Sequence, residues 1–115
     1  MSNQFYIKQN DSRPKIATQL KDGAGEPIDI SGYEAVYFHM EEQDSEEVII
    51  EKEAEVVNAE KGEIQYNWDR GDTSEHGVFN CEWMVDFGEG EVETFPNDGY
   101  NIVIITRQIA GVYEE

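Results

Sequence analysis

The feature that most constrains the fold is an alternation of apolar and polar residues with a period of two. It is cleanest in residues 63–68 and recurs in the longest such segment, residues 78–87. Successive side chains of a strand point to opposite faces, so this pattern is typical of strands with one buried face. No segment of ten or more residues has the 3.6-residue period of an amphipathic helix. The sequence therefore predicts an all-β protein.

The expected strands are short, and turns rich in Gly, Asn, Asp and Pro separate them. The strands are predicted over residues 5–8, 16–20, 33–40, 48–57 (as one long strand or two), 64–68, 78–87, 92–95 and 100–106, with a short extended piece at 28–30 and a hairpin-type turn at 58–62. Seven to eight strands at this spacing predict an immunoglobulin-like antiparallel β-sandwich. We expect one domain over residues 1–115, with its core at about 5–106 and a C-terminal tail at 107–115.

The net charge restricts the partners. Asp and Glu total 26 and Lys and Arg total 8, which gives a formal charge of −18. Nucleic acids and anionic membranes are not expected partners, because both need an excess of basic residues. An acidic surface adapted to concentrated salt, a surface for a basic partner or one that mimics nucleic acid, and a calcium-binding surface stay open. The carboxylates spread along the whole chain instead of clustering, and lysines number five, so we favour the first and expect a halophilic source.

Candidate catalytic and metal-binding residues do not form a recognisable motif. His39 and His76 are isolated in sequence, and Cys81 lies on the predicted core face of its strand, where a small buried hydrophobe is expected. The single cysteine excludes an internal disulfide. The turn at 22–26 lacks the spacing of an EF-hand loop. We therefore expect a protein that is not an enzyme and that has no catalytic residues, no metal and no cofactor.

The sequence shows no signal for membrane insertion or secretion. No apolar run approaches the ~20 residues of a membrane span, and the first residues do not resemble a signal peptide.

Protein binding is the expected activity, and aromatic side chains are its best candidates. Six aromatic residues on or beside the predicted strands are considered, and about half of them are expected in the core: Tyr33, Tyr37, Tyr66, Trp68, Trp83 and Tyr100. The loops at 9–14 and 69–77 and the sheet edges are expected to contact neighbouring proteins. Within the second loop, Arg70-Gly71-Asp72 matches an adhesion tripeptide, but turn chemistry explains it better. The candidate interface residues are Arg13, Tyr33, Tyr37, Arg70, Asp72 and Tyr100.

The order of the segments carries a family resemblance. The relevant segments are residues 7–14, 22–32, 36–40, 62–68, 71–73, 77–79 and 92–100, which close with Phe-Pro-Asn-Asp-Gly-Tyr at 95–100. Together they resemble the N-terminal immunoglobulin-like domain of phage baseplate upper proteins, over about residues 5–105. The resemblance implies a virion structural protein in the tail tip or baseplate that docks onto neighbouring particle proteins. Its motif residues are structural, so it implies no catalytic residues.

Several expectations about function follow from this resemblance. The protein is expected in the virion, as a homo-oligomer or symmetric array in contact with baseplate, tail or capsid proteins. Members of the family often continue into a longer C-terminal region that leads towards receptor binding, whereas this sequence stops at Glu115. A stand-alone adaptor is therefore one expectation, and a head-decoration or turret subunit is an alternative. A carbohydrate-binding adhesion module, which would use exposed aromatic side chains, is a second alternative.

Overall fold

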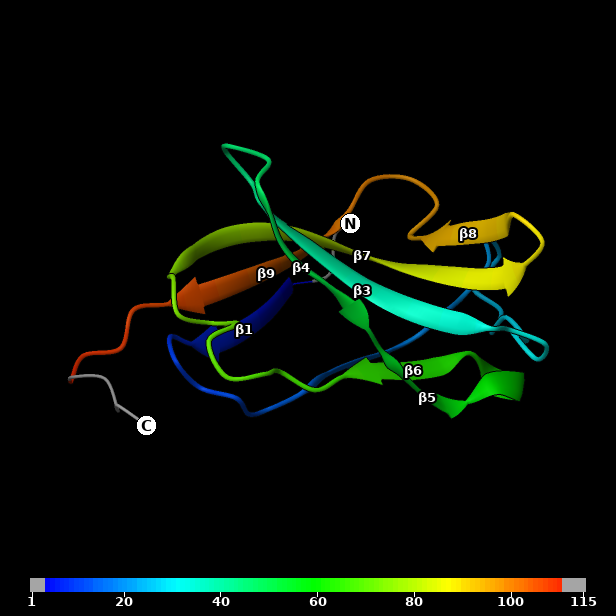
Figure 1. Ribbon diagram of the computed structural model, residues 1–115, viewed down its shortest axis with the longest axis horizontal. Helices are drawn as coiled ribbons and strands as arrows, with labels where there is room; N and C mark the ends of the chain where they lie inside the picture. Colours follow the sequence, from blue (N-terminus) through cyan, green and yellow to red (C-terminus); the bar gives the residue numbers. More distant parts are fainter. Residues whose placement is uncertain (1–3, 111–115) are drawn as a thin grey trace.

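The computed structural model describes residues 4–110, which form nine strands and one short 3-10 helix (Figure 1). Residues 111–115 of the predicted tail lie outside the described part. The elements are β1 (Gln4–Lys8), β2 (Ile16–Gln19), β3 (Ala35–Glu42), β4 (Val48–Glu53), β5 (Glu55–Asn58), η1 (Ala59–Lys61), β6 (Glu63–Tyr66), β7 (Gly77–Gly88), β8 (Glu91–Phe95) and β9 (Asn101–Thr106). The expectation of an all-β protein is confirmed.

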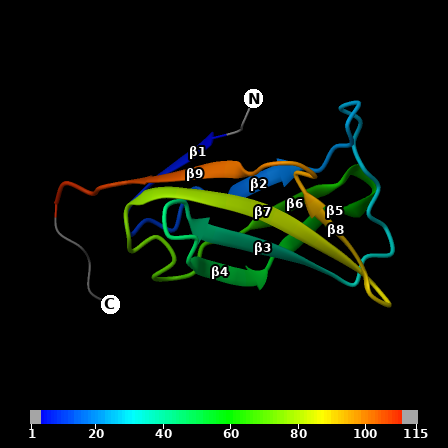
Figure 2. The same cartoon turned by 90° about the horizontal axis from the view of Figure 1, so that it is seen from above.

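The strands form two sheets that pack as a sandwich (Figures 1 and 2). The larger sheet has the order β1-β9-β7-β3-β4, with β8 also paired to β7, and the smaller has the order β2-β6-β5. The sandwich is confirmed, but the expectation that it is antiparallel throughout is wrong for one pair. β1 runs parallel to β9, with Gln4 opposite Ile102 and Lys8 opposite Thr106. Alternation fixes which face a side chain takes and carries no information on strand direction.

The segment 48–57 forms two strands, which is one of the two expected arrangements. β4 pairs with β3 in the larger sheet, and β5 pairs with β6 in the smaller one, so the chain changes sheets at Ala54. This change raises the strand count to nine. Residues 28–30 are not a strand; Ile30 is fully buried, and its backbone N–H donates to Ala59.

The turn at 58–62 contains η1 and depends on a glycine. Asn58 caps η1 by accepting a hydrogen bond from the Lys61 N–H, and Gly62 ends it with φ at 67°. A Cβ on Gly62 would lie 2.5 Å from the carbonyl oxygen of Ile28. The left-handed conformation and the lack of space both require glycine here.

The core lies between the two sheets and is centred on aromatic rings. Phe38 of β3 lies with its ring centroid 4.8 Å from Tyr66, 4.8 Å from Trp83 and 5.8 Å from Trp68. These three partners are buried, which confirms that about half of the six strand-associated aromatics belong to the core. Cys81 is buried on the predicted face. Within residues 4–110, no helix has the length and apolar character needed to cross a membrane.

Candidate interaction surface

The two predicted contact loops lie together at one end of the sandwich. Residues 9–14 follow β1, and residues 69–76 precede β7; we call these residues the two-loop surface. The Asn10 N–H donates to the Thr73 carbonyl at 2.9 Å, and the Thr73 hydroxyl donates to the Asp11 carbonyl at 2.7 Å. The Gln9 side chain donates to the Ser74 carbonyl at 2.9 Å. These bonds hold two segments about 60 residues apart in sequence in one fixed arrangement.

Buried groups beneath the two-loop surface anchor it to the core. Thr73 is 2% exposed. Trp68, which packs against Phe38, donates from its indole N–H to the Pro14 carbonyl at 2.9 Å. The first loop is thereby bonded to a core side chain, and the second loop contributes a buried side chain of its own. A surface anchored in this way loses little conformational freedom when a partner binds.

Asp72 organises the second loop from within. Its carboxylate accepts hydrogen bonds from the Tyr66 hydroxyl at 2.5 Å, from the Asp69 N–H at 2.8 Å and from the Lys52 ammonium at 3.0 Å. Its side chain is 6% exposed. Burial and the bond to Asp72 raise the pKa of the Tyr66 hydroxyl, and the same carboxylate raises the pKa of Lys52. The turn-chemistry interpretation of Gly71-Asp72 fits this geometry, because the Asp72 carboxylate is turned into the protein.

Basic side chains gather around the two-loop surface. Six of the eight Lys and Arg residues lie at this end, on the loops or beside them, whereas Lys21 and Lys61 lie at the opposite end. The six are Lys8, Arg13, Lys15, Lys52, Arg70 and Arg107. Arg13 and Lys15 also line an open hollow, and Arg13 and Arg70 are both exposed. This end therefore holds most of the basic residues of a strongly acidic chain, beside the acidic residues Asp11, Asp69, Asp72 and Glu75 of the same loops.

The structure divides the six candidate interface residues among three places. Arg13, Arg70 and Asp72 belong to the two-loop surface. Tyr37 of β3 and Tyr100, just before β9, lie on the outer side of the larger sheet, where Tyr37 is half-buried and Tyr100 exposed. Tyr33 follows Ile30 at the opposite end from the two-loop surface and is 37% exposed.

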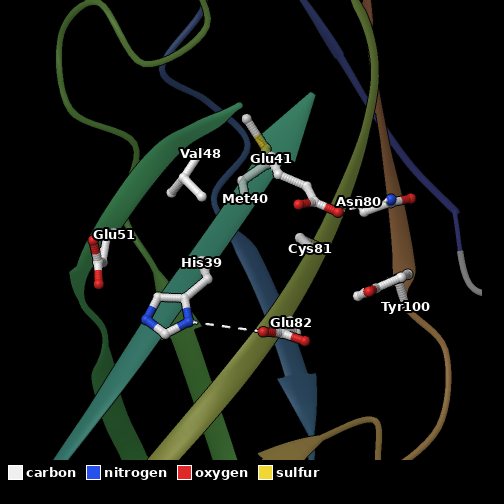
Figure 3. Close-up of a pocket in the computed structure, with 9 residues that line it drawn as sticks. All are labelled: His39, Met40, Glu41, Val48, Glu51, Asn80, Cys81, Glu82 and Tyr100. Carbon is white, nitrogen blue, oxygen red and sulfur yellow. Dashed lines mark hydrogen bonds and ion pairs between the residues drawn. The ribbon is translucent and has the colours of Figure 1, made fainter. Parts of the chain in front are cut away.

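A hollow on the outer face of the larger sheet is the second candidate site (Figure 3). Its volume is 180 Å³, below the ~300 Å³ at which pockets for small-molecule ligands begin. The Nδ1 atom of His39 lies 3.9 Å from a carboxylate oxygen of Glu82, and the two side chains point toward each other across β3 and β7. Burial raises the pKa of the Cys81 thiol to about 12, so at neutral pH it is protonated and a poor nucleophile.

Neither a metal-binding cluster in the described residues nor a match to known proteins assigns a function. Among residues 4–110, no group of three or more His, Cys, Asp or Glu side chains is arranged to hold a metal ion. No protein-family model and no curated protein matches the chain. The resemblance to baseplate upper proteins therefore depends on the order and spacing of the segments and on their close at residues 95–100.

The sequence predicts the two loops but not the groups that join them. No pattern marks Thr73, Gln9 or Lys52, because isolated polar residues near turns carry no periodic signal. The one signal available was composition: Asn10, Asp11, Asp69 and Asp72 are residues that bond to nearby backbone in turns.

Proposed function

We propose that this protein is a structural subunit of a tailed-virus particle, a non-enzymatic module that docks onto a neighbouring tail or baseplate protein. The observation that carries the proposal is the two-loop surface. It is held in place by hydrogen bonds between distant segments, it is anchored to the core, and it displays Arg13 and Arg70 to solvent. The order of segments that resembles baseplate upper proteins supports the viral setting.

The chemistry of this end favours an acidic patch on the partner. Arginine forms bidentate hydrogen bonds with carboxylates and is enriched in protein interfaces. A chain with charge −18 repels acidic proteins at low salt, and this repulsion is smallest at the end where most of the Lys and Arg residues gather. Many copies around a symmetric particle would make individually weak contacts effective together.

Mass spectrometry and electron microscopy of purified particles test the viral role. We expect the protein in virions at a fixed ratio to tail proteins; its absence from particles would end the proposal. A fixed ratio to capsid proteins would instead identify the head-decoration or turret alternative. Specific glycan binding that Tyr33→Ala or Tyr100→Ala abolishes would identify the carbohydrate-binding alternative.

Charge reversal tests the docking surface itself. Arg13→Glu with Arg70→Glu should reduce incorporation into particles by about tenfold or more, because charges now repel across the contact. Lys21→Glu with Lys61→Glu is the matched control, with the same change of charge at the opposite end. Equal incorporation of both double variants would contradict the assignment of the two-loop surface.

A salty environment is the second part of the proposal. At ~0.1 M salt the screening length is about 10 Å, and at ~1 M it is about 3 Å, so concentrated salt removes most of the repulsion within so acidic a chain. We expect the melting temperature to rise steadily between 0.1 and 3 M salt. A flat or falling curve would contradict a halophilic source.

A further inference from the structure

The acidic residues are absent from one set of strands. β1, β2 and β9 contain no Asp or Glu, whereas each of the other six strands contains at least one. β1 and β2 are edge strands of the two sheets, and residues from both line one cleft together with Ile102 of β9. One side of the sandwich is therefore free of strand carboxylates, in a chain where 26 of 115 residues are acidic.

The β1 edge on this side is open. β1 pairs with β9 along one edge, and no other described strand pairs with it; in Figure 2 it is the outermost strand of its sheet. A strand paired along one edge leaves unpaired backbone N–H and C=O groups along the other, which is a template for another strand.

Exposed apolar side chains lead up to this edge. On the outer face of the larger sheet, Tyr6 of β1 lies opposite Ile104 of β9, which lies opposite Val78 of β7. Tyr6 is 59% exposed and Val78 40% exposed. The row ends at the open edge, so a strand added to β1 would extend it.

We propose that β1 pairs in antiparallel fashion with β1 of a second copy of this chain, about a two-fold axis at Tyr6. Tyr6 is the central residue of β1, so the axis places Tyr6 opposite Tyr6. The same register places Gln4 opposite Lys8 and Phe5 opposite Ile7. The larger sheets of the two copies become continuous, and the apolar row doubles from three residues to six.

A second copy is the occupant that the charges favour. Each copy carries −18, so two copies can approach closely only where carboxylates are absent. The proposed register sets no like charges opposite each other, since Lys8 faces an amide, and pairs apolar residues on the inner face. Edge strands β4, β5 and β8 each carry Glu, so antiparallel self-pairing there would bring carboxylates of the two copies together.

Sedimentation velocity of the full chain tests the pairing. We expect a monomer–dimer equilibrium that shifts toward dimer between 0.15 and 1 M sodium chloride, because salt screens the repulsion between the copies. Tyr6→Glu should weaken dimerisation about tenfold or more, because it places two carboxylates opposite each other at the axis. Val48→Glu on β4 is the matched control: Val48 is 57% exposed, so it receives the same charge at a similar exposure, and its dimer should be unchanged.

Cross-linking tests the register. Directly opposed side chains have Cβ atoms about 5 Å apart, so a Tyr6→Cys variant should form a covalent dimer with a short bismaleimide reagent. Native Cys81 is 1% exposed and stays unmodified, and Val48→Cys should form no covalent dimer. A wild-type chain that is monomeric in 1 M salt, a dimer that Tyr6→Glu leaves intact, or a dimer in which Tyr6→Cys does not cross-link would each overturn the proposal. Particle incorporation is not the readout, so this result stands apart from that of the docking proposal.

Discussion

Two edges of the larger sheet, formed by β1 and β4, differ in charge, in pairing and in their bonds to neighbouring loops. β1 has no acidic residue, and its pairing with β9 runs without a register shift. β4 carries Glu51 and Glu53, and its pairing with β3 is interrupted by a register shift between Met40 and Glu41. Lys52 of β4 is also bonded to Asp69 and Asp72 of the neighbouring loop. Charge and the register shift thus protect the β4 edge from pairing with another strand, and Lys52 attaches it to the neighbouring loop. The β1 edge has neither kind of protection and is open.

The difference shows how an acidic chain can control association. Charged side chains and bulges are common ways of blocking an exposed strand edge. Here carboxylates occupy the β4, β5 and β8 edges, while the strands of the β1 side lack them. Every other described strand carries Asp or Glu, so the lack of acidic residues in β1, β2 and β9 marks the side where charge does not oppose the approach of another chain.

The largest effect we predict concerns the isoleucines that attach each edge strand to the core. Ile7 of β1 is 4% exposed and Ile50 of β4 is 1% exposed. Ile7→Ala and Ile50→Ala should each lower the free energy of unfolding by about 2–5 kcal/mol, because both leave cavities between the sheets. Urea unfolding measures the change. If Ile7→Ala left the free energy of unfolding unchanged, β1 would be loosely packed on the core. It would then not be comparable with β4 as a fixed edge of the sheet.

The strands and their buried faces could be predicted from the sequence because alternation reports burial directly. Residues such as Phe38, Trp83 and Ile64 lie in the core as their spacing predicts. The parallel pairing of β1 with β9 could not be predicted, because it joins segments about 98 residues apart in sequence. Local patterns contain no information about such contacts.

The candidate site could be predicted only in part. Turn-forming residues predict the loops at 9–14 and 69–77, and Arg13 and Arg70 are exposed on them. The inward orientation of Asp72 depends on Tyr66 and Lys52, which approach it only after the sheets pack. The open β1 edge depends on the order of strands in the sheet, which turn signals and alternation do not specify.

A smaller effect is predicted for the attachment of the β4 edge. Asp72→Asn should lower the free energy of unfolding by about 1.5–3 kcal/mol, because it weakens charge-assisted bonds to a nearly buried carboxylate. Asp69→Asn is the control; its side chain is 65% exposed, and its effect should be small. Thermal unfolding distinguishes the two, and an effect of Asp72→Asn no larger than that of Asp69→Asn would contradict a special contribution of the bonds to the Asp72 carboxylate.

The same network should make stability fall at high pH. The pKa of Tyr66 is raised from 10.0 by burial and then by its bond to Asp72, so the unfolded chain releases this proton first. The contribution of the protonated Tyr66 hydroxyl to the free energy of unfolding is therefore complete below pH 10 and is lost as the pH rises above that value. Urea unfolding between pH 9 and 11.5 should show a shallower decline for Tyr66→Phe than for the wild type. Parallel declines would mean that Tyr66 ionises equally in both states.

The smallest effect on stability is predicted where the charges of the β4 edge are removed. Glu51 and Glu53 are exposed, so Glu51→Gln with Glu53→Gln should change the free energy of unfolding by less than about 0.5 kcal/mol per substitution. Neutral side chains no longer repel a second strand, so this variant should self-associate more strongly than the wild type in sedimentation velocity. The increase should persist when Tyr6→Glu is added, because it arises at the other edge. If association does not change, the register shift and the Lys52 bonds are sufficient to block strand pairing at β4. Geometry would then contribute more than charge to the difference between the β1 and β4 edges.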